Sequence, residues 1–240
     1  MDNKEFTFGV YIPTTKRYSR GVITGKWFLE PKHVVRESEK KLYEDAGFQN
    51  IIAVEDTLIC SYSKVYNWIV KNAEEDVVVI ADDDVKAFVY MLDYNYPIPD
   101  ALTCQAEFER LGQLLLDLNI GLAFGPATPT PYNYTAEFRW SGIPGAFKVV
   151  NRKAIKAKMD TMLYRNTDID YVLQELLKNR ICLNANYLVD NPVEDDITNT
   201  TGANYNVAGI NASVEIMKSR WGMYFSYNSK KNVPRIQVKR

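Results

Sequence analysis

The run Val77-Val-Val-Ile-Ala81 constrains the fold of this chain more than any other segment. Five consecutive apolar residues, most of them β-branched, predict a strand that is buried on both faces, and helices must then cover both sides of its sheet. Short β-rich runs alternate with amphipathic helical patterns along the chain: the runs lie at 6–12, 50–54, 120–124 and 145–150, and the patterns at 37–46, 63–70, 108–118 and 169–177. This alternation predicts an α/β fold with a mostly parallel central sheet flanked by helices.

The composition is that of one globular domain, and it excludes several kinds of site. The chain has 240 residues, of which 46% are hydrophobic and 25% charged, which is enough to form a core without disulfides. Cys60, Cys104 and Cys182 are widely spaced and include no CxxC pair, which argues against a thiolate zinc site. His33 is the single histidine, so chemistry that needs two imidazoles is excluded.

Charge and hydropathy set expectations about partners. The formal net charge is −1, so the whole molecule exerts no electrostatic attraction on nucleic acid and any such contact needs a local basic patch. The first residues are polar and charged, and the longest apolar runs are too short to cross a bilayer. We therefore expect a cytoplasmic protein with no membrane partner; the sequence leaves its oligomeric state open.

Three aspartates, Asp82-Asp83-Asp84, directly follow the apolar strand. Ligands of open α/β sheets bind beyond the carboxyl ends of the strands, which is where this triplet lies. Three adjacent carboxylates repel one another and need a cation, and hard oxygen ligands suit Mn²⁺ or Mg²⁺ shared with a phosphate group. The chemistry that fits is a metal that turns a diphosphate into a good leaving group. The alternative is that Asp84 caps a following helix while its neighbours face solvent.

The order of these motifs resembles the GT-A family of nucleotide-sugar glycosyltransferases. The triplet is preceded by the helical segment 63–70 and followed much later by Thr167-Asp-Ile-Asp170. Two segments resemble, within that fold, the TET-associated glycosyltransferases of bacteriophages: Arg36-Glu-Ser-Glu39 through Tyr43, and the SKxxNWI stretch before VVVIADDDV. Those enzymes glycosylate hydroxymethylated pyrimidines in phage DNA. The resemblance spans roughly residues 6 to 180.

The resemblance implies a single GT-A-like domain over 1–240, with a nucleotide-sugar-binding half (1–100), an acceptor-binding half (101–189) that contains a long loop, and a mobile loop and basic tail (190–240). It also implies a nucleotide diphosphate sugar, such as a UDP-sugar, as donor, with Asp82 and Asp84 as metal ligands. The residues implied in donor binding are Thr14, Arg17, Tyr18, Arg20, Lys64, Asn67, Asp82, Asp83 and Lys218. Lys64 and Asn67 are equally explained as a solvated helix face. Many GT-A enzymes add a metal ligand near the C-terminus, often histidine; here that role would fall to water, to an Asp or Asn of the 190–211 loop, or to nothing.

The second acidic motif, Thr167-Asp-Ile-Asp170, opens an amphipathic helical pattern. In GT-A enzymes the matching position offers a carboxylate that removes the proton of the acceptor hydroxyl, so we expect Asp168 to be the catalytic base and Asp170 to support it in an inverting transfer. The alternative is a variant capping box with Thr167 at the N-cap.

Aromatic and basic residues supply candidates for acceptor binding. Tyr132, Tyr134, Arg139 and Trp140 would stack on and read a sugar ring or a flipped base, although packed loop aromatics give the same pattern. Arg220, Lys230, Lys231 and Arg235 belong to a basic, aromatic tail suited to a DNA backbone, or to a solvated terminus. The expected reaction is sugar transfer to a 5-hydroxymethylpyrimidine in DNA. The alternatives are a glycan or protein acceptor, a nucleotidyltransferase, and an inactive binding module.

Overall fold

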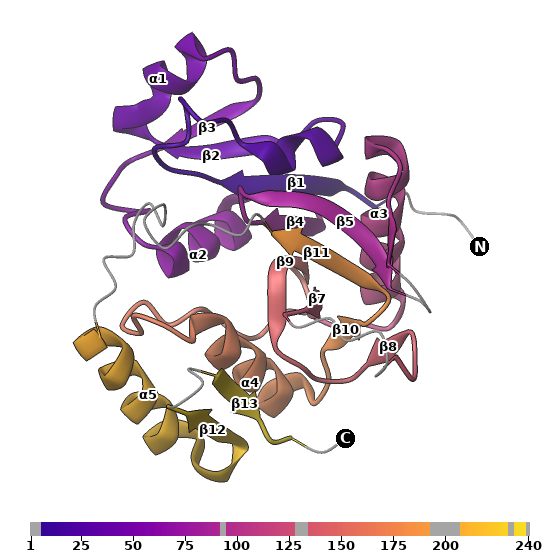
Figure 1. Ribbon diagram of the computed structural model, residues 1–240, viewed down its shortest axis with the longest axis vertical. Coiled ribbons are helices and arrows are strands. Elements are labelled where there is room, and N and C mark those ends of the chain that lie inside the picture. Colours follow the sequence, from indigo (N-terminus) through magenta and orange to yellow (C-terminus); the bar gives the residue numbers. More distant parts are fainter. Residues whose placement is uncertain (1–5, 92–94, 128–133, 193–206, 230–232, 239–240) are drawn as a thin grey trace.

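The computed structural model describes residues 6–91, 95–127, 134–192, 207–229 and 233–238. Within these ranges the centre of the molecule is an eight-stranded sheet of order β3-β2-β1-β4-β9-β7-β10-β8 (Figure 1). Its strands are β1 (Phe8–Pro13), β2 (Lys32–Arg36), β3 (Ile51–Val54), β4 (Val77–Ala81), β7 (Leu122–Pro126), β8 (Phe138–Arg139), β9 (Pro144–Asn151) and β10 (Leu183–Ala185). All five residues of β4 are buried, as the apolar run predicts.

The sheet is parallel in one half and mixed in the other. β3, β2, β1 and β4 are mutually parallel, whereas β9 is antiparallel to both of its neighbours, β4 and β7. The reason lies in the connection. β7 and β9 are adjacent in space, and the described residues between them (127 and 134–143) contain no crossover helix, as is typical of antiparallel neighbours.

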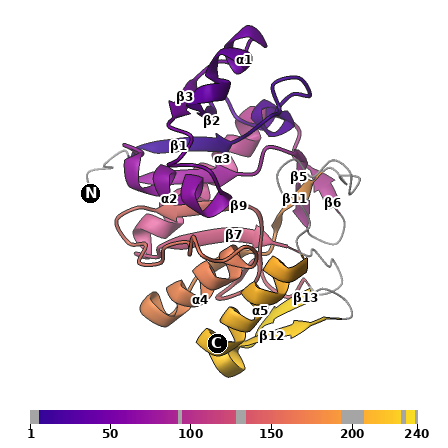
Figure 2. The ribbon, with the colours of Figure 1, turned by 90° about the vertical axis from the view of Figure 1, so that its left-hand side faces the viewer.

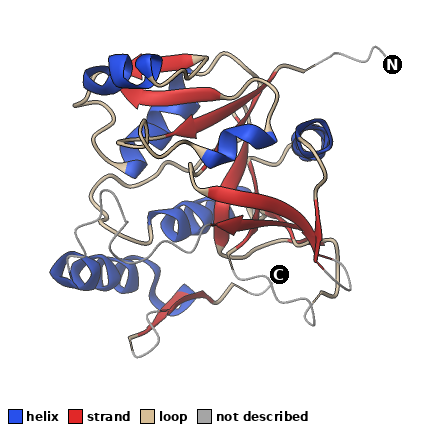
Figure 3. Cartoon of the chain, turned by 45° about the horizontal axis from the view of Figure 1, so that its top comes forward, coloured by secondary structure: helices blue, strands red, loops and turns tan. Residues whose placement is uncertain are grey.

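Helices cover both faces of the sheet, as the strand pattern requires. α2 (Tyr62–Asn72) and α4 (Thr167–Asn179) pack on one face and α3 (Ala101–Asp117) on the other, so that α2 and α3 lie on opposite sides of β1 (Figure 2). On the α3 side the core is aromatic, with the ring centroids of Phe108 and Phe147 4.9 Å apart. Figure 3 shows the same layering, with strands in the middle and helices outside.

Smaller elements complete the fold. α1 (Lys40–Asp45) follows the 3₁₀ turn Glu37–Glu39 beside β3, and a second 3₁₀ turn, Ile23–Trp27, lies beside β5. β5 (Val85–Met91), β6 (Asn95–Pro97) and β11 (Leu188–Pro192) form a second sheet of order β11-β5-β6. Within the described ranges, no helix combines the length and the apolarity that a membrane span requires.

The sequence predicts a mobile loop and a basic tail after residue 190, but the described residues from 207 onward contain regular structure. They form α5 (Val207–Trp221), a 3₁₀ turn (Gly222–Tyr224) and the hairpin β12 (Phe225–Asn228) with β13 (Val233–Ile236). Val214, Met217 and Phe225 are buried against Ile169 and Leu173 of α4, and this small core anchors the unit. The segment 193–206 of the expected mobile loop lies outside the described residues.

Candidate functional site

The acidic triplet forms the turn between β4 and β5. The N–H of Asp82 donates to the carbonyl of Ala146 (2.8 Å), and the hydroxyl of Thr24 donates to the carbonyl of Asp82 (2.6 Å) while accepting from the N–H of Val85 (2.8 Å). Thr24 is fully buried. Because Asp84 leads into a strand, the alternative in which it caps a helix is excluded.

Asp83 faces the loop that follows β1. Its Oδ2 accepts a hydrogen bond from the Thr14 hydroxyl (2.6 Å), and its Oδ1 lies 3.5 Å from Nε of Arg17. The hydroxyl of Tyr43 is 3.0 Å from that of Thr14 and accepts from the N–H of Arg17 (3.0 Å). The structure therefore brings Thr14 and Arg17 to the triplet, as the resemblance implies, and ties their loop to Asp83.

Asp84 is the more exposed of the two aspartates that Arg17 contacts. Its side chain is 25% exposed, against 15% for Asp83, and its Oδ2 lies 3.5 Å from Nη2 of Arg17. One guanidinium thus bridges two carboxylates.

Asp82 interacts with Tyr62 of α2 and with Lys148 of β9. Tyr62, the first residue of α2, has a hydrogen bond with Asp82 and lies close enough to Asp168 for that carboxylate to act on it. Burial, together with these negative charges, raises the pKa of the Tyr62 hydroxyl. The Tyr62 phenol therefore interacts with both Asp82 and Asp168.

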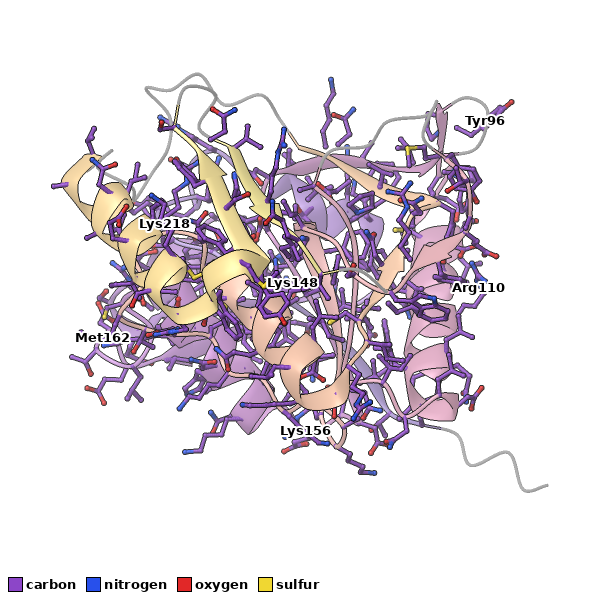
Figure 4. All side chains as sticks on the ribbon, turned by 90° about the horizontal axis from the view of Figure 1, so that it is seen from below. Tyr96, Arg110, Lys148, Lys156, Met162 and Lys218 are labelled. Carbon is purple, nitrogen blue, oxygen red and sulfur yellow. The ribbon has the colours of Figure 1, made fainter. Side chains whose placement is uncertain are left out.

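Lys148 of β9 is a buried cation in contact with the Tyr62 hydroxyl. It is 2% exposed, and its Nζ donates to the Tyr62 hydroxyl (3.2 Å) and to the carbonyl of Gly145 (3.2 Å). Figure 4 places Lys148 in the middle of the molecule, whereas the labelled Arg110 and Met162 lie at its margins. Sequence analysis missed this residue. The available signal was a lysine inside an otherwise apolar strand.

Asp190 of β11 adds a fourth carboxylate. Its Oδ1 accepts from the N–H of Ala146 (3.0 Å), and a Cβ at Gly145 would collide with it, which explains the glycine there. Burial raises the pKa of Asp190, with Lys148 opposing the rise and Asp84 adding to it. Only the general expectation of an Asp or Asn from residue 190 onward anticipates this position.

The pKa of Asp82 reflects the excess of negative charge around it. Burial raises its pKa to about 7; Lys148 opposes this rise, and the charges of Asp84, Asp190 and Asp83 add to it. Four carboxylates thus face the cations Lys148 and Arg17 in the described part of the chain.

This donor set fits a hard divalent cation, because Mg²⁺ and Mn²⁺ prefer carboxylate oxygens and offset such an excess of charge. Asp82 and Asp84, the pair expected from the sequence, would hold it. Among the described residues, no group of three or more His, Cys, Asp or Glu side chains already converges on a metal position.

The two aspartates of the second acidic motif have different surroundings. Asp168 is partly exposed, its Oδ1 accepts from the N–H of Ile169 (2.9 Å), and its charge reaches Tyr62. Asp170 is fully buried and accepts from Arg220 Nη1 (2.8 Å), Trp221 Nε1 (2.8 Å) and Gln174 Nε2 (2.7 Å). Asp170 therefore fastens α5 to α4. The helix begins at Thr167 after a left-handed Asn166 with no side-chain cap, unlike a capping box.

The other donor-side candidates have structural partners. Both amide atoms of Asn67 bond the backbone of Met159 (2.8 and 3.0 Å), and Lys64 donates to the carbonyl of Thr57 (3.4 Å). Lys218 pairs with Glu215 (2.8 Å) at the surface. Tyr18 packs edge-on against Tyr43 (centroids 5.7 Å apart), and Arg20 closes a turn onto Arg17.

The acceptor-side and DNA candidates are dispersed. Arg139 lies on β8 opposite Asn184, and Trp140 beside it is 47% exposed; Tyr134 is partly buried. Arg220 pairs with Asp170 and with Asp160 (2.6 Å). Arg235 lies on β13. Tyr132, Lys230 and Lys231 lie outside the described residues.

Comparison with known proteins bears on the fold. No protein-family model and no curated protein matches the chain. The glucosyl-3-phosphoglycerate synthase of Mycobacterium tuberculosis, solved with Mg²⁺ and UDP, matches with a TM-score of 0.51 and 10% identity over 97% of this chain and 87% of its own. The same enzyme with Mn²⁺, UDP-glucose and glycerol 3-phosphate gives 0.53 and 11% over the same shares. A structure described as a mycobacterial protein gives 0.54 and 11% over 96% and 83%. The GT-A-like fold predicted from the sequence is thereby confirmed.

Proposed function

We propose that this chain is a divalent-metal-dependent glycosyltransferase whose donor is a nucleotide diphosphate sugar, most simply a UDP-sugar. The observation that carries the proposal is the acidic turn Asp82–Asp84 at the carboxyl end of β4 in a GT-A-like sheet, where Asp190 adds a fourth carboxylate. The similar fold of a synthase crystallised with Mn²⁺ and UDP-glucose supports this choice of metal and donor.

The roles follow from the surroundings of each residue. Asp82 and Asp84 would hold the metal, which would neutralise the diphosphate so that it leaves readily. Thr14 and Arg17 keep the loop after β1 against Asp83, on the side where the donor would lie. Tyr62 and Lys148 hold Asp82 in place from beneath.

Asp168 is the proposed general base. It is partly exposed, and its charge and that of Asp82 both act on Tyr62, so a hydroxyl acceptor near Asp168 would also be near the donor site. Removal of the hydroxyl proton as that oxygen attacks the anomeric carbon is the chemistry of an inverting transfer. As acceptor we propose a 5-hydroxymethylpyrimidine in DNA, on the strength of the sequence resemblance alone.

Thermal melting tests the donor and metal together. We expect UDP with Mn²⁺ to raise the melting temperature of the wild type, because a ligand of the native state stabilises it by mass action. Asp84→Asn should abolish this shift and leave the fold intact, whereas the matched variant Asp45→Asn, on the exposed surface of α1, should retain it. If no nucleoside diphosphate gives a metal-dependent shift in the wild type, the proposed function is wrong.

An acceptor panel tests the rest of the reaction. With UDP-glucose and Mn²⁺, the protein should release UDP faster when the acceptor is duplex DNA containing 5-hydroxymethylcytosine than when it is unmodified DNA, 3-phosphoglycerate or a free monosaccharide. Turnover on a small acceptor alone would reject DNA as the acceptor and keep the glycosyltransferase.

A further inference from the structure

We propose that the aromatic ring of Tyr62 is the surface on which the hexose of the donor packs, so that this residue orients the anomeric carbon between the diphosphate and the base. This inference rests on the proposed function. It assigns recognition of the sugar ring to a residue outside both acidic motifs, one that the sequence analysis did not single out.

Tyr62 is the first residue of α2, and it lies where the two acidic motifs meet. Its hydroxyl donates a hydrogen bond to Asp82, and the charge of Asp168 acts on it. Asp82 belongs to the proposed metal and diphosphate site, and Asp168 is the proposed base. The transferred sugar must lie between the leaving diphosphate and the attacking hydroxyl, so a side chain close to both aspartates is close to the sugar.

The hydroxyl of Tyr62 is held by buried groups while part of the residue reaches solvent. Besides donating to Asp82, the hydroxyl accepts from Nζ of Lys148 (3.2 Å), a residue that is 2% exposed. The ring packs on that of the fully buried Tyr66, with centroids 6.2 Å apart. Tyr62 itself is 38% exposed, and the surface that it exposes is not the part in contact with Lys148 or Tyr66. An aromatic side chain is therefore presented to solvent with its orientation fixed.

The chemistry of a hexose fits such a ring. A hexose carries hydroxyls at its edge and C–H groups on its faces, and packing one face on an aromatic ring removes apolar surface from water. The face of the ring also carries negative charge density, which favours the positive charge that develops at the anomeric carbon as the diphosphate leaves. Because the Tyr62 side chain is already held in place, little conformational entropy is lost on binding.

The alternative is that Tyr62 serves only to position Asp82 through its hydroxyl. A residue with that role would affect every metal-bound nucleotide alike, whether or not the nucleotide carries a sugar. The two roles are therefore separated by comparing UDP with UDP-glucose, since only the second has a hexose.

Calorimetric titrations at saturating Mn²⁺ and without acceptor measure the affinities of UDP and of UDP-glucose, and the ratio of the two isolates the sugar. Any effect of a substitution on the metal or on Asp82 changes both affinities and cancels in the ratio. We expect Tyr62→Ala to lower the affinity for UDP-glucose relative to UDP about tenfold. Tyr62→Phe keeps the ring without the hydroxyl and should leave the ratio within about twofold of the wild-type value.

Two further variants serve as controls. Tyr96→Ala removes a tyrosine of β6 that is 51% exposed and lies at the margin of the molecule in Figure 4, and it should leave both affinities unchanged. Tyr62→Leu keeps an apolar side chain without an aromatic face, so it should lower the ratio about threefold or more. This variant carries the test if Tyr62→Ala fails to fold.

The outcomes distinguish this inference from the function on which it rests. If Tyr62→Ala, or Tyr62→Leu in its place, keeps the wild-type ratio, the role of the ring is refuted, while a wild type that binds UDP with Mn²⁺ keeps the proposed function. A wild type that binds UDP but not UDP-glucose refutes it as well, and so does a ratio that falls as far in Tyr62→Phe as in Tyr62→Ala. If the wild type binds neither nucleotide with Mn²⁺, both the inference and the proposed function are refuted.

Discussion

Asp82 is the residue at which burial and charge conflict most directly. Its pKa is about 7 because the carboxyl is buried and lies near Asp84, Asp190 and Asp83, with Lys148 as the opposing cation. A protein retains such a destabilised group when the group has a task other than stability. The arrangement therefore predicts that function and stability respond in opposite directions here.

Asp82→Asn should stabilise the ligand-free protein. The amide keeps an oxygen that accepts from Tyr62 and removes a buried negative charge, so we expect a gain of about 1 kcal/mol, or roughly 2–4 °C in melting temperature. The same variant should lose the Mn²⁺-dependent shift with UDP. Asp45→Asn, exposed on α1, should change neither quantity. A lower melting temperature for Asp82→Asn would contradict this account.

His33 predicts how stability depends on pH. Burial lowers its pKa, although its Nδ1 donates to the carbonyl of Gln49 (3.1 Å), and its ring packs edge-on against Phe48. The unfolded chain takes up a proton near pH 6.5, before the native state does, so stability is complete above that value and is lost as pH falls through the native pKa.

Urea unfolding at pH 7.5, 6.5 and 5.5 measures this contribution. Asp82, whose pKa is raised to about 7, adds stability to the wild type and to His33→Asn alike as pH falls, so the His33 contribution appears as a difference between them. Across the interval the wild type should lose stability relative to His33→Asn, whose amide can still donate to Gln49, although the variant is less stable at pH 7.5. Parallel slopes for the two proteins would remove His33 as the cause.

At the scale of elements, α4 uses neighbouring aspartates for different purposes. Asp168 lies at the edge of the site, whereas Asp170 accepts from Arg220, Trp221 and Gln174 and joins α5 to α4. A sequence pattern cannot separate the two, because both carboxylates suit the first turn of a helix equally well.

Substitution of Asp170 should therefore lower stability, whereas substitution of Asp168 should lower turnover. Asp170→Ala removes a fully buried carboxylate and leaves the Trp221 and Gln174 donors without that acceptor, so we expect it to cost about 1–3 kcal/mol and to increase hydrogen exchange in α5. Asp168→Asn should reduce turnover by about 10²–10⁴-fold and leave the urea midpoint within the error of the measurement. Comparable loss of stability in both variants would show that Asp168 is structural too.

At the scale of the molecule, the sheet joins the two halves that the resemblance implies. β4, in the half where donor binding is expected (1–100), pairs with β9, in the half where acceptor binding is expected (101–189), and β9 pairs in turn with β7. The main sheet is shared between the two halves, and separating them would expose the edge of β4 that pairs with β9.

The whole chain should therefore unfold cooperatively. Circular dichroism and tryptophan fluorescence should report one coincident urea transition, and a fragment of residues 1–100 should not fold alone. A folded fragment, or two separated transitions, would establish the halves as independent units.

Local sequence by itself determined the bounds of β4, the position of the triplet and most of the buried faces of α2, α3 and α4, although Leu118 and Leu177, at the ends of the predicted apolar stripes, are exposed. The reason is that burial on one or both faces leaves a periodicity that neighbouring residues carry. The triplet also follows β4 directly in the sequence, so a site at the carboxyl end of that strand, at Asp82–Asp84, could be predicted.

Tertiary structure alone decided which groups meet that site. Tyr62, Lys148 and Asp190 come from a helix, an antiparallel strand and a second sheet, and no local pattern records that these elements converge. The same holds for Arg17, whose charge could serve any partner until folding set it against Asp83 and Asp84. Hydrophobic periodicity is encoded residue by residue, whereas the pairing of charges depends on which distant segments fold together.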